Sequence, residues 1–124
     1  MILKTTRKDD GPMAKKSFLF AIKVIRECKV LIQQNEFILS RQLMRSGTSV
    51  GALIRESKNA ESHRDFIHKL SIAQKEADET IYWIDLLYEC EYIDSNKYSE
   101  LHSYAVELMK MLTSTLKSLK QKST

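Results

Sequence analysis

Two sets of polar and charged residues have the spacing that would place them on facing helices. Within each set the members are three, four or seven positions apart, so they share one helix face beside an apolar stripe. The sets are Gln42, Arg45, Ser49 and Glu56, and Lys69, Glu76 and Glu79. Because an unpaired buried charge is costly, we expect Arg45 to pair with one of these carboxylates. The resulting half-buried network would fix the register of two helices.

A di-metal carboxylate centre is the alternative role for these acids, since four-helix bundles hold such centres between facing helices. That chemistry needs acids from all four helices and a Glu-x-x-His pair on two of them. Neither Glu76 nor Glu79 has a histidine at that spacing, and Glu27 and Glu107 are expected to point away from the core. We therefore expect no metal ion and no cofactor.

No motif in the sequence assembles a catalytic site. The histidines, His63, His68 and His102, lack ligand spacing, and we expect them at the surface or at helix ends. There is no GxSxG nucleophile motif or phosphate-binding loop, and Gly47 and Gly51 do not follow a strand. We expect a protein that is not an enzyme and has no catalytic residues.

Lysines and arginines predict a nucleic-acid surface. The net charge is +4, with +5 in residues 1–30, +2 in 31–60, −5 in 61–93 and +2 in 94–124. Aligned cations neutralise phosphates without reading bases, which gives salt-sensitive binding to RNA or DNA. The candidate residues are Lys15, Lys16, Lys23, Arg26, Arg41 and Arg55. Two alternatives remain: an ordinary solvated helix surface, and a protein-interaction scaffold whose partner docks on the acidic segment or in a channel.

Four predicted helices must position these residues. They span about 14–34, 37–60, 63–91 and from 94–95 to the C-terminus, and the sequence has only three Gly and one Pro. Apolar residues three and four positions apart define each inward face. These are Phe18, Ala21, Ile25, Cys28 and Ile32; Leu39, Leu43, Val50, Leu53 and Ile54; Phe66, Leu70, Ala73, Ala77, Ile81, Ile84 and Tyr88; and Tyr98, Leu101, Ala105, Leu108, Leu112, Leu116 and Leu119. Short loops between them predict an all-α, up-down-up-down antiparallel four-helix bundle.

Gly47 and Gly51 lie inside the second predicted helix, one turn apart. Each internal glycine costs about 1 kcal/mol of helix preference relative to alanine. We expect another backbone to approach the helix closely at these positions.

We predict a single domain over residues 13–124, preceded by a flexible charged arm, residues 1–12, that ends in Gly11-Pro12. Cys28 and Cys90 are not a CxxC pair and are expected as reduced thiols. No stretch has the length of a signal peptide's apolar region or of a membrane span. We expect a soluble, cytoplasmic protein.

The third predicted helix has a second apolar stripe, about 140° from its core stripe. The stripe consists of Ile72, Trp83, Leu86 and Cys90. Either neighbouring helices cover it or another subunit does, and monomers seldom expose such a patch. We expect a homo-oligomer, although the pattern does not determine the copy number.

The chain resembles the four-helix bundle family first noticed in reading frames inserted in bacterial 23S ribosomal RNA genes, the intervening-sequence proteins. The resemblance covers nearly the whole chain after Pro12. Its most specific residues are Gln42, Arg45, Ser49-Val50-Gly51 and Glu56, with Asp65-Phe66, Lys69-Leu70, Ile72-Ala73 and Glu76. Leu53 stands where the family commonly has Asn, so packing would replace any polar contact made by that side chain.

The resemblance implies a cyclic homopentamer of bundles around a central channel. It also implies a distant likeness to the accessory variability protein of diversity-generating retroelements. That protein is a basic pentamer that associates with reverse transcriptase and with RNA or DNA. An accessory role in nucleic-acid transactions, with a reverse transcriptase or another protein as partner, is the corresponding expectation here.

Overall fold

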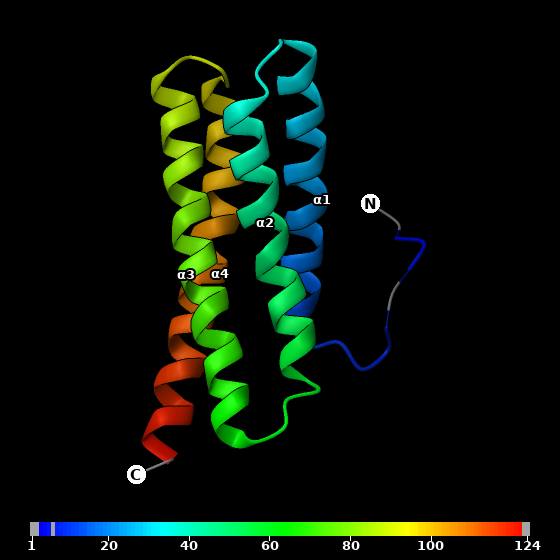
Figure 1. Cartoon of the computed structure of the whole chain (residues 1–124), viewed down its shortest axis with the longest axis vertical. Coiled ribbons are helices and arrows are strands. Elements are labelled where there is room, and N and C mark those ends of the chain that lie inside the picture. The colour runs from blue at the N-terminus through cyan, green and yellow to red at the C-terminus, as the bar shows by residue number, and fades with distance from the viewer. Residues whose placement is uncertain (1–2, 6, 123–124) are drawn as a thin grey trace.

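The computed structural model describes residues 3–5 and 7–122, which form four helices. These are α1 (Pro12–Gln33), α2 (Ile38–Ser57), α3 (His63–Glu89) and α4 (Ser95–Lys122). Consecutive helices run in opposite directions and lie side by side (Figure 1). Each helix packs on the next and α4 also packs on α1, while the backbones of the diagonally opposite helices, over their described residues, stay farther apart. The predicted all-α, up-down bundle is confirmed for this single chain.

The core faces of α2 and α4 agree with the predicted stripes. Leu43, Val50 and Ile54 are buried on α2, and α4 buries its leucine and alanine stripe. That stripe comprises Leu101, Ala105, Leu108, Leu112 and Leu116. Leu53 is half-buried and packs against this core, so the residue at the position of the family's Asn contributes apolar packing.

The inward face of α1 differs from the predicted one. Its large buried apolar residues are Phe20, Val24, Cys28 and Leu31. The predicted residues Phe18, Ala21 and Ile25 are only half-buried, and Ile32 is 44% exposed. Apolar residues cover two faces of α1, so periodicity alone does not select between them. Of the five residues of the predicted stripe, only Cys28 is fully buried.

Gly47 explains why the Val24 face of α1 turns inward. A Cβ atom at position 47 would lie 2.8 Å from Cγ1 of Val24, so the missing side chain accommodates the valine. At Gly51 the nearest atom would be the backbone oxygen of Ser17, at 3.3 Å. The expected backbone approach is therefore present at Gly51, whereas at Gly47 the close neighbour is a side chain.

The core face of α3 is also partly different from the prediction. Leu87 is fully buried, while the predicted Tyr88 is 37% exposed. Thr80 is buried as well, and its hydroxyl donates to the Glu76 carbonyl at 2.6 Å and lies 2.9 Å from the Ser46 hydroxyl. A polar residue can occupy the core here because α2 and α3 satisfy its hydroxyl locally.

The turns after α1 and α3 have the same backbone hydrogen bonds. The amide of Glu36 donates to the carbonyl of Leu31, and the amide of Tyr92 donates to the carbonyl of Leu87. Both turns pass through a left-handed residue, Asn35 with φ 64° and Glu91 with φ 65°. This is the Schellman ending, in which a left-handed residue lets amides beyond the helix satisfy its last carbonyls.

Side chains cap the first turns of α3 and α4. Asp94 accepts from the amide of Lys97 at 2.8 Å, and Ser62 accepts from the amide of Asp65 at 3.0 Å. The third helix therefore begins at His63, as predicted from the Ser62 and Asp65 pattern.

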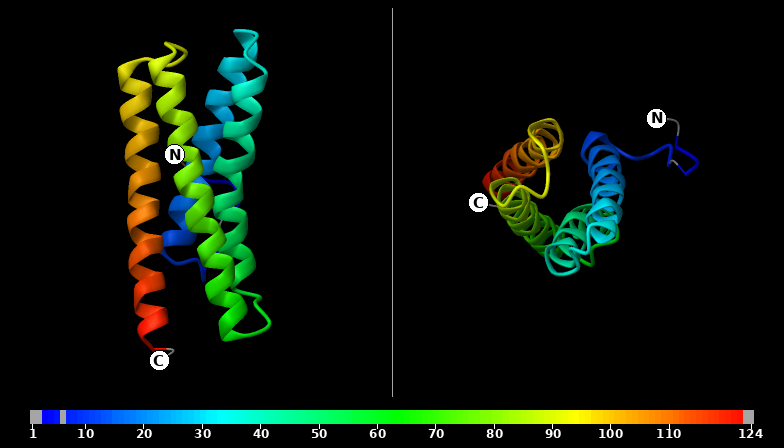
Figure 2. Two further views of the ribbon diagram at one scale, coloured as in Figure 1. Left: turned by 60° about the vertical axis from the view of Figure 1, so that its left-hand side comes forward. Right: turned by 90° about the horizontal axis from the view of Figure 1, so that it is seen from above.

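The described residues before α1 have no helical structure and lie beside α1 on the outside of the bundle (Figure 2). Asp10 binds the Nζ atom of Lys58 at 2.6 Å, and this hydrogen bond lowers the pKa of its carboxyl. Residues 1–2 and 6 of the predicted arm, and 123–124 of the predicted domain, lie outside the described residues. Within the described residues, no helix is both long and apolar enough to cross a membrane.

Candidate functional site

The predicted polar network forms as two separate groups between α2 and α3. Nη1 of Arg45 lies 3.3 Å from Glu76, and Nη2 bonds to Glu79 and approaches Gln42 at 3.5 Å. The hydrogen bond with Glu79 raises the pKa of Arg45. The hydroxyl of Ser49 donates to the backbone carbonyl of Arg45 at 2.6 Å, so its hydrogen bond is made within α2 and not to a charged side chain.

Glu56 pairs with Lys69 at 3.8 Å and is not bonded to Arg45. The side chain of Arg45 is 47% exposed, so water screens this cluster on one side. Among the described residues, no three His, Cys, Asp or Glu side chains come together as a set that could hold a metal ion. The Arg45 cluster therefore links α2 and α3 through charge pairs.

Lys16 and Lys23, two of the predicted nucleic-acid residues, face α4. Lys16 pairs with Glu107, and Lys23 pairs with Glu100 at 3.0 Å. Both ammonium groups also lie over the ring of Tyr104, at 4.4 and 5.0 Å from its centroid. These contacts partly neutralise the two lysines and tie α1 to α4.

The remaining four candidate cations are exposed but do not form one patch. Lys15 is near the start of α1 and Arg55 near the end of α2, where its guanidinium lies 5.8 Å from the centroid of Phe18. Arg26 and Arg41 lie toward the other end of the bundle. The predicted line of six cations is therefore divided between the two halves of the molecule.

Charge is instead segregated along the bundle axis. If each helix is divided at its midpoint, the half nearer the C-terminus contains residues 11–22, 48–75 and 109–122 (Figure 1). This half has eleven Lys or Arg residues and only three acids. The other half, residues 23–47 and 76–108, has six Lys or Arg residues and eleven acids. We call the first the basic end.

The sequence analysis missed several cations of the basic end. Lys110, Lys117, Lys120 and Lys122 lie on the last turns of α4, and Arg64 lies on the first turn of α3. One sequence signal could have revealed the α4 group, since no acid follows Glu107. Their proximity to Lys15 and Arg55 depends on the antiparallel packing of the helices.

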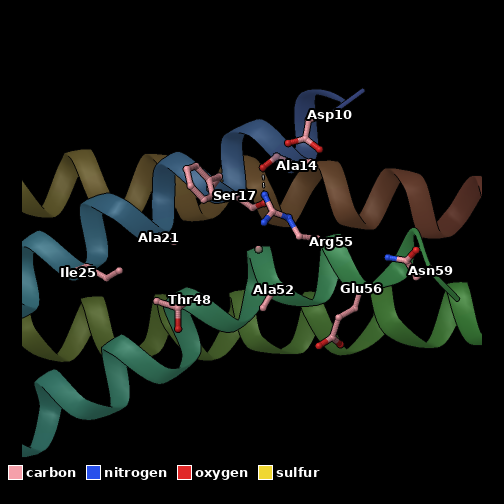
Figure 3. Close-up of a pocket in the computed structure, with 12 residues that line it drawn as sticks. Asp10, Ala14, Ser17, Ala21, Ile25, Thr48, Ala52, Arg55, Glu56 and Asn59 are labelled. Carbon is pink, nitrogen blue, oxygen red and sulfur yellow. Dashed lines mark hydrogen bonds between the residues drawn. The ribbon is translucent and has the colours of Figure 1, made fainter. Parts of the chain in front are cut away.

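A groove of about 480 Å³ lies between α1 and α2. Its lining includes the outward residues Phe18, Ala21 and Ile25 of α1, and Arg55 and Asp10 lie toward its end near the start of α1 (Figure 3). Three residues of the predicted core stripe of α1, Phe18, Ala21 and Ile25, thus line a surface groove.

Two titratable groups in the second half of α1, Glu27 and Cys28, are buried. Burial raises the pKa of Cys28 to about 12, and its thiol donates to the Ser40 carbonyl at 3.3 Å. Glu27 was expected to point outward, but it is only 6% exposed, and burial raises the pKa of its carboxyl. The prediction was wrong because the whole of α1 is rotated toward the Val24 face.

The four predicted interface residues occupy different environments on α3. Ile72, Trp83 and Leu86 are half-buried, and Cys90 is exposed. Trp83 packs against the chain's own core, and its Nε1 atom is buried without a hydrogen-bond partner among the described residues. Neighbouring helices therefore cover part of the stripe, while part remains at the surface.

Comparison with known families gives one decisive match. The model of the 23S rRNA-intervening sequence protein family matches residues 10–114, which include all of α1, α2 and α3 and most of α4. The chain belongs to this family. No curated protein matches the chain.

A crystal structure of another protein is similar over most of the chain. It comes from Bacteroides thetaiotaomicron and is described as a protein of unknown function from the S23 ribosomal protein family. The identity is 45% and the TM-score 0.84, with 85% of this chain and 98% of that chain covered. The two proteins therefore share the same fold, and the similarity extends over nearly the whole of that protein.

Proposed function

We propose that this intervening-sequence protein is a non-enzymatic, oligomeric accessory protein that binds structured RNA or DNA through phosphate contacts. The observation that supports the proposal is the segregation of eleven cations against three acids at the basic end. Such a surface attracts polyanions without selecting a sequence. Of the residues first predicted, Lys15 and Arg55 are exposed on this surface, while Lys16 is paired with Glu107.

Self-association would enlarge the basic surface, because copies arranged side by side in a closed ring would place their basic ends together. Two apolar regions of the single chain support this part of the proposal. They are the α3 stripe that includes Trp83 and the α1–α2 groove that includes Phe18. A homopentamer is the copy number that the family resemblance suggests.

The function is tested by titrating the full chain into a labelled RNA hairpin and a labelled DNA duplex at 50 and 200 mM salt. The test variant combines Lys117→Gln, Lys120→Gln and Lys122→Gln, and the control combines Arg26→Gln, Lys29→Gln and Arg41→Gln. Each lost phosphate contact lowers the salt slope by about 0.7 to 1. We expect the test variant to bind at least tenfold more weakly with a shallower slope, and the control to bind like the wild type.

Binding that is absent at low salt, or that does not change with salt, would remove the proposal. Equal losses in both triple variants would show that total charge matters and that the basic end does not. If binding is absent at low salt or does not change with salt, the better assignment is a protein-interaction scaffold that does not bind nucleic acid.

A further inference from the structure

The exposed large apolar side chains gather at the end opposite the basic end. We call this the hairpin end, and it is formed by the two turns at 34–37 and 90–94 (Figure 2). Among the described residues, seven large hydrophobic side chains are exposed, and six of them adjoin these turns. The six are Val30, Ile32, Phe37, Ile38, Tyr88 and Tyr92. A surface of this kind marks an interaction site more often than a plain solvent face.

The α1–α2 turn supplies the apolar part of the hairpin end. Ile38 is 76% exposed and Phe37 is 53% exposed, although both could have been polar without loss to the core. Beside them lies a hollow of about 250 Å³, which is lined by Ile32, Phe37, Ser40, Arg41 and Met44. This hollow has room for an apolar side chain from outside the protein.

The α3–α4 turn supplies aromatic rings and negative charge. Tyr88 and Tyr92 are each 37% exposed, and Tyr88 is held by stacking on Tyr98 with centroids 4.3 Å apart. Glu89 and Glu91 are exposed beside them, and the sequence has no Lys or Arg between Lys75 and Lys97. Aromatic faces next to carboxylates attract Lys and Arg side chains.

We propose that the hairpin end docks a cationic amphipathic helix of a partner protein. The apolar face of that helix would cover Phe37 and Ile38, and its Lys and Arg residues would meet the tyrosines and carboxylates of the α3–α4 turn. Charge complementarity selects this occupant, because the half of the bundle that contains the hairpin end has eleven acids and six Lys or Arg residues, so its net charge attracts a cationic helix and repels nucleic acid. The two ends of the bundle then serve different partners.

The probe is a labelled 18-residue helical peptide with Leu on one face and Lys on the other, titrated into the full chain by fluorescence anisotropy. The first variant is Phe37→Ser combined with Ile38→Ser, and the second is Glu89→Lys combined with Glu91→Lys. We expect each to bind the peptide at least tenfold more weakly than the wild type. Tyr82→Ser is the matched control, since Tyr82 is 57% exposed on α3 away from the turns, and it should bind like the wild type.

Three outcomes would overturn the proposal. Both double variants could bind as tightly as the wild type, or the wild type could bind a shuffled peptide of the same composition equally well. A fall in oligomer mass in the Phe37→Ser and Ile38→Ser variant would show that a second copy covers this end. Nucleic-acid binding at the basic end is measured separately and should be unchanged in the Phe37→Ser and Ile38→Ser variant, so the two proposals can fail independently.

Discussion

At the scale of single residues, the contact between Gly47 and Val24 determines how α1 and α2 fit together. An added Cβ at Gly47 would be 2.8 Å and 2.9 Å from the two methyl groups of Val24, and a valine side chain has little rotamer freedom to move away. The corresponding contact at Gly51 is 3.3 Å, which is only slightly tight. The two glycines therefore differ, although the sequence places them in equivalent positions.

We predict that Gly47→Ala lowers the free energy of unfolding by about 1 to 2 kcal/mol, because overpacking outweighs the gain in helix preference. Gly51→Ala should be close to neutral, and serves as the matched control. Chemical denaturation measures both. Val24→Ala should offset part of the Gly47→Ala loss in a double-mutant cycle, and additive losses would mean that the two side chains do not clash.

Glu27 gives a second prediction at the residue scale. Burial raises its pKa in the folded state above that in the unfolded state. Its carboxyl therefore favours folding most at low pH, and this contribution is lost as the pH rises through the folded-state pKa. We expect Glu27→Gln to be more stable than the wild type at pH 7, with the difference shrinking toward pH 4. Thermal unfolding of both proteins across this pH range measures the difference. If Glu27→Gln were less stable than the wild type at pH 7, or if the difference in stability did not change with pH, burial would not be what sets the pKa of Glu27.

At the scale of elements, the two Schellman turns connect helices with the same backbone path but different residues. The left-handed position is Asn35 in one turn and Glu91 in the other. Asparagine tolerates this conformation, whereas other side chains incur a cost of about 1 to 2 kcal/mol there. The α3–α4 turn therefore has a less favourable residue at its tip than the α1–α2 turn.

We predict that Glu91→Gly raises the free energy of unfolding by about 0.5 to 1 kcal/mol, because relief of the left-handed strain exceeds the entropy that glycine adds to the unfolded chain. Asn35→Gly should change it by less. The comparison uses denaturant midpoints at equal m-values. A destabilising Glu91→Gly would show that the carboxylate makes a contact that outweighs the backbone strain.

At the scale of the whole molecule, the α3 stripe leads to a prediction about self-association. We predict that Trp83→Ala lowers the oligomer mass measured by light scattering well below the melting temperature, because the ring would lose contacts with a neighbouring copy. Tyr92→Ala is the control, because Tyr92 is an exposed aromatic residue nine positions after Trp83, and it should keep the mass of the wild type. An unchanged mass in Trp83→Ala, together with a lower melting temperature, would assign Trp83 to the core of its own protomer.

The sequence by itself determined the four helices, their order and the inward faces of α2 and α4. These follow from local rules, since apolar spacing, few Gly and Pro residues, and caps such as Ser62 act within a few residues of one another. The pairing of Arg45 with acids of α3 also follows from spacing once the helices are adjacent. The family model matches residues 10–114, which include the α2 and α3 residues that carry the resemblance.

Only the tertiary structure decided which face of α1 is buried and where charge accumulates. Both faces of α1 satisfy helical periodicity, and the choice between them depends on how Val24 fits Gly47 on another helix. The basic end brings together the start of α1, the end of α2, the start of α3 and the end of α4. These segments are distant in the sequence, and antiparallel packing makes them neighbours. No local pattern contains that information, because it arises from contacts between helices.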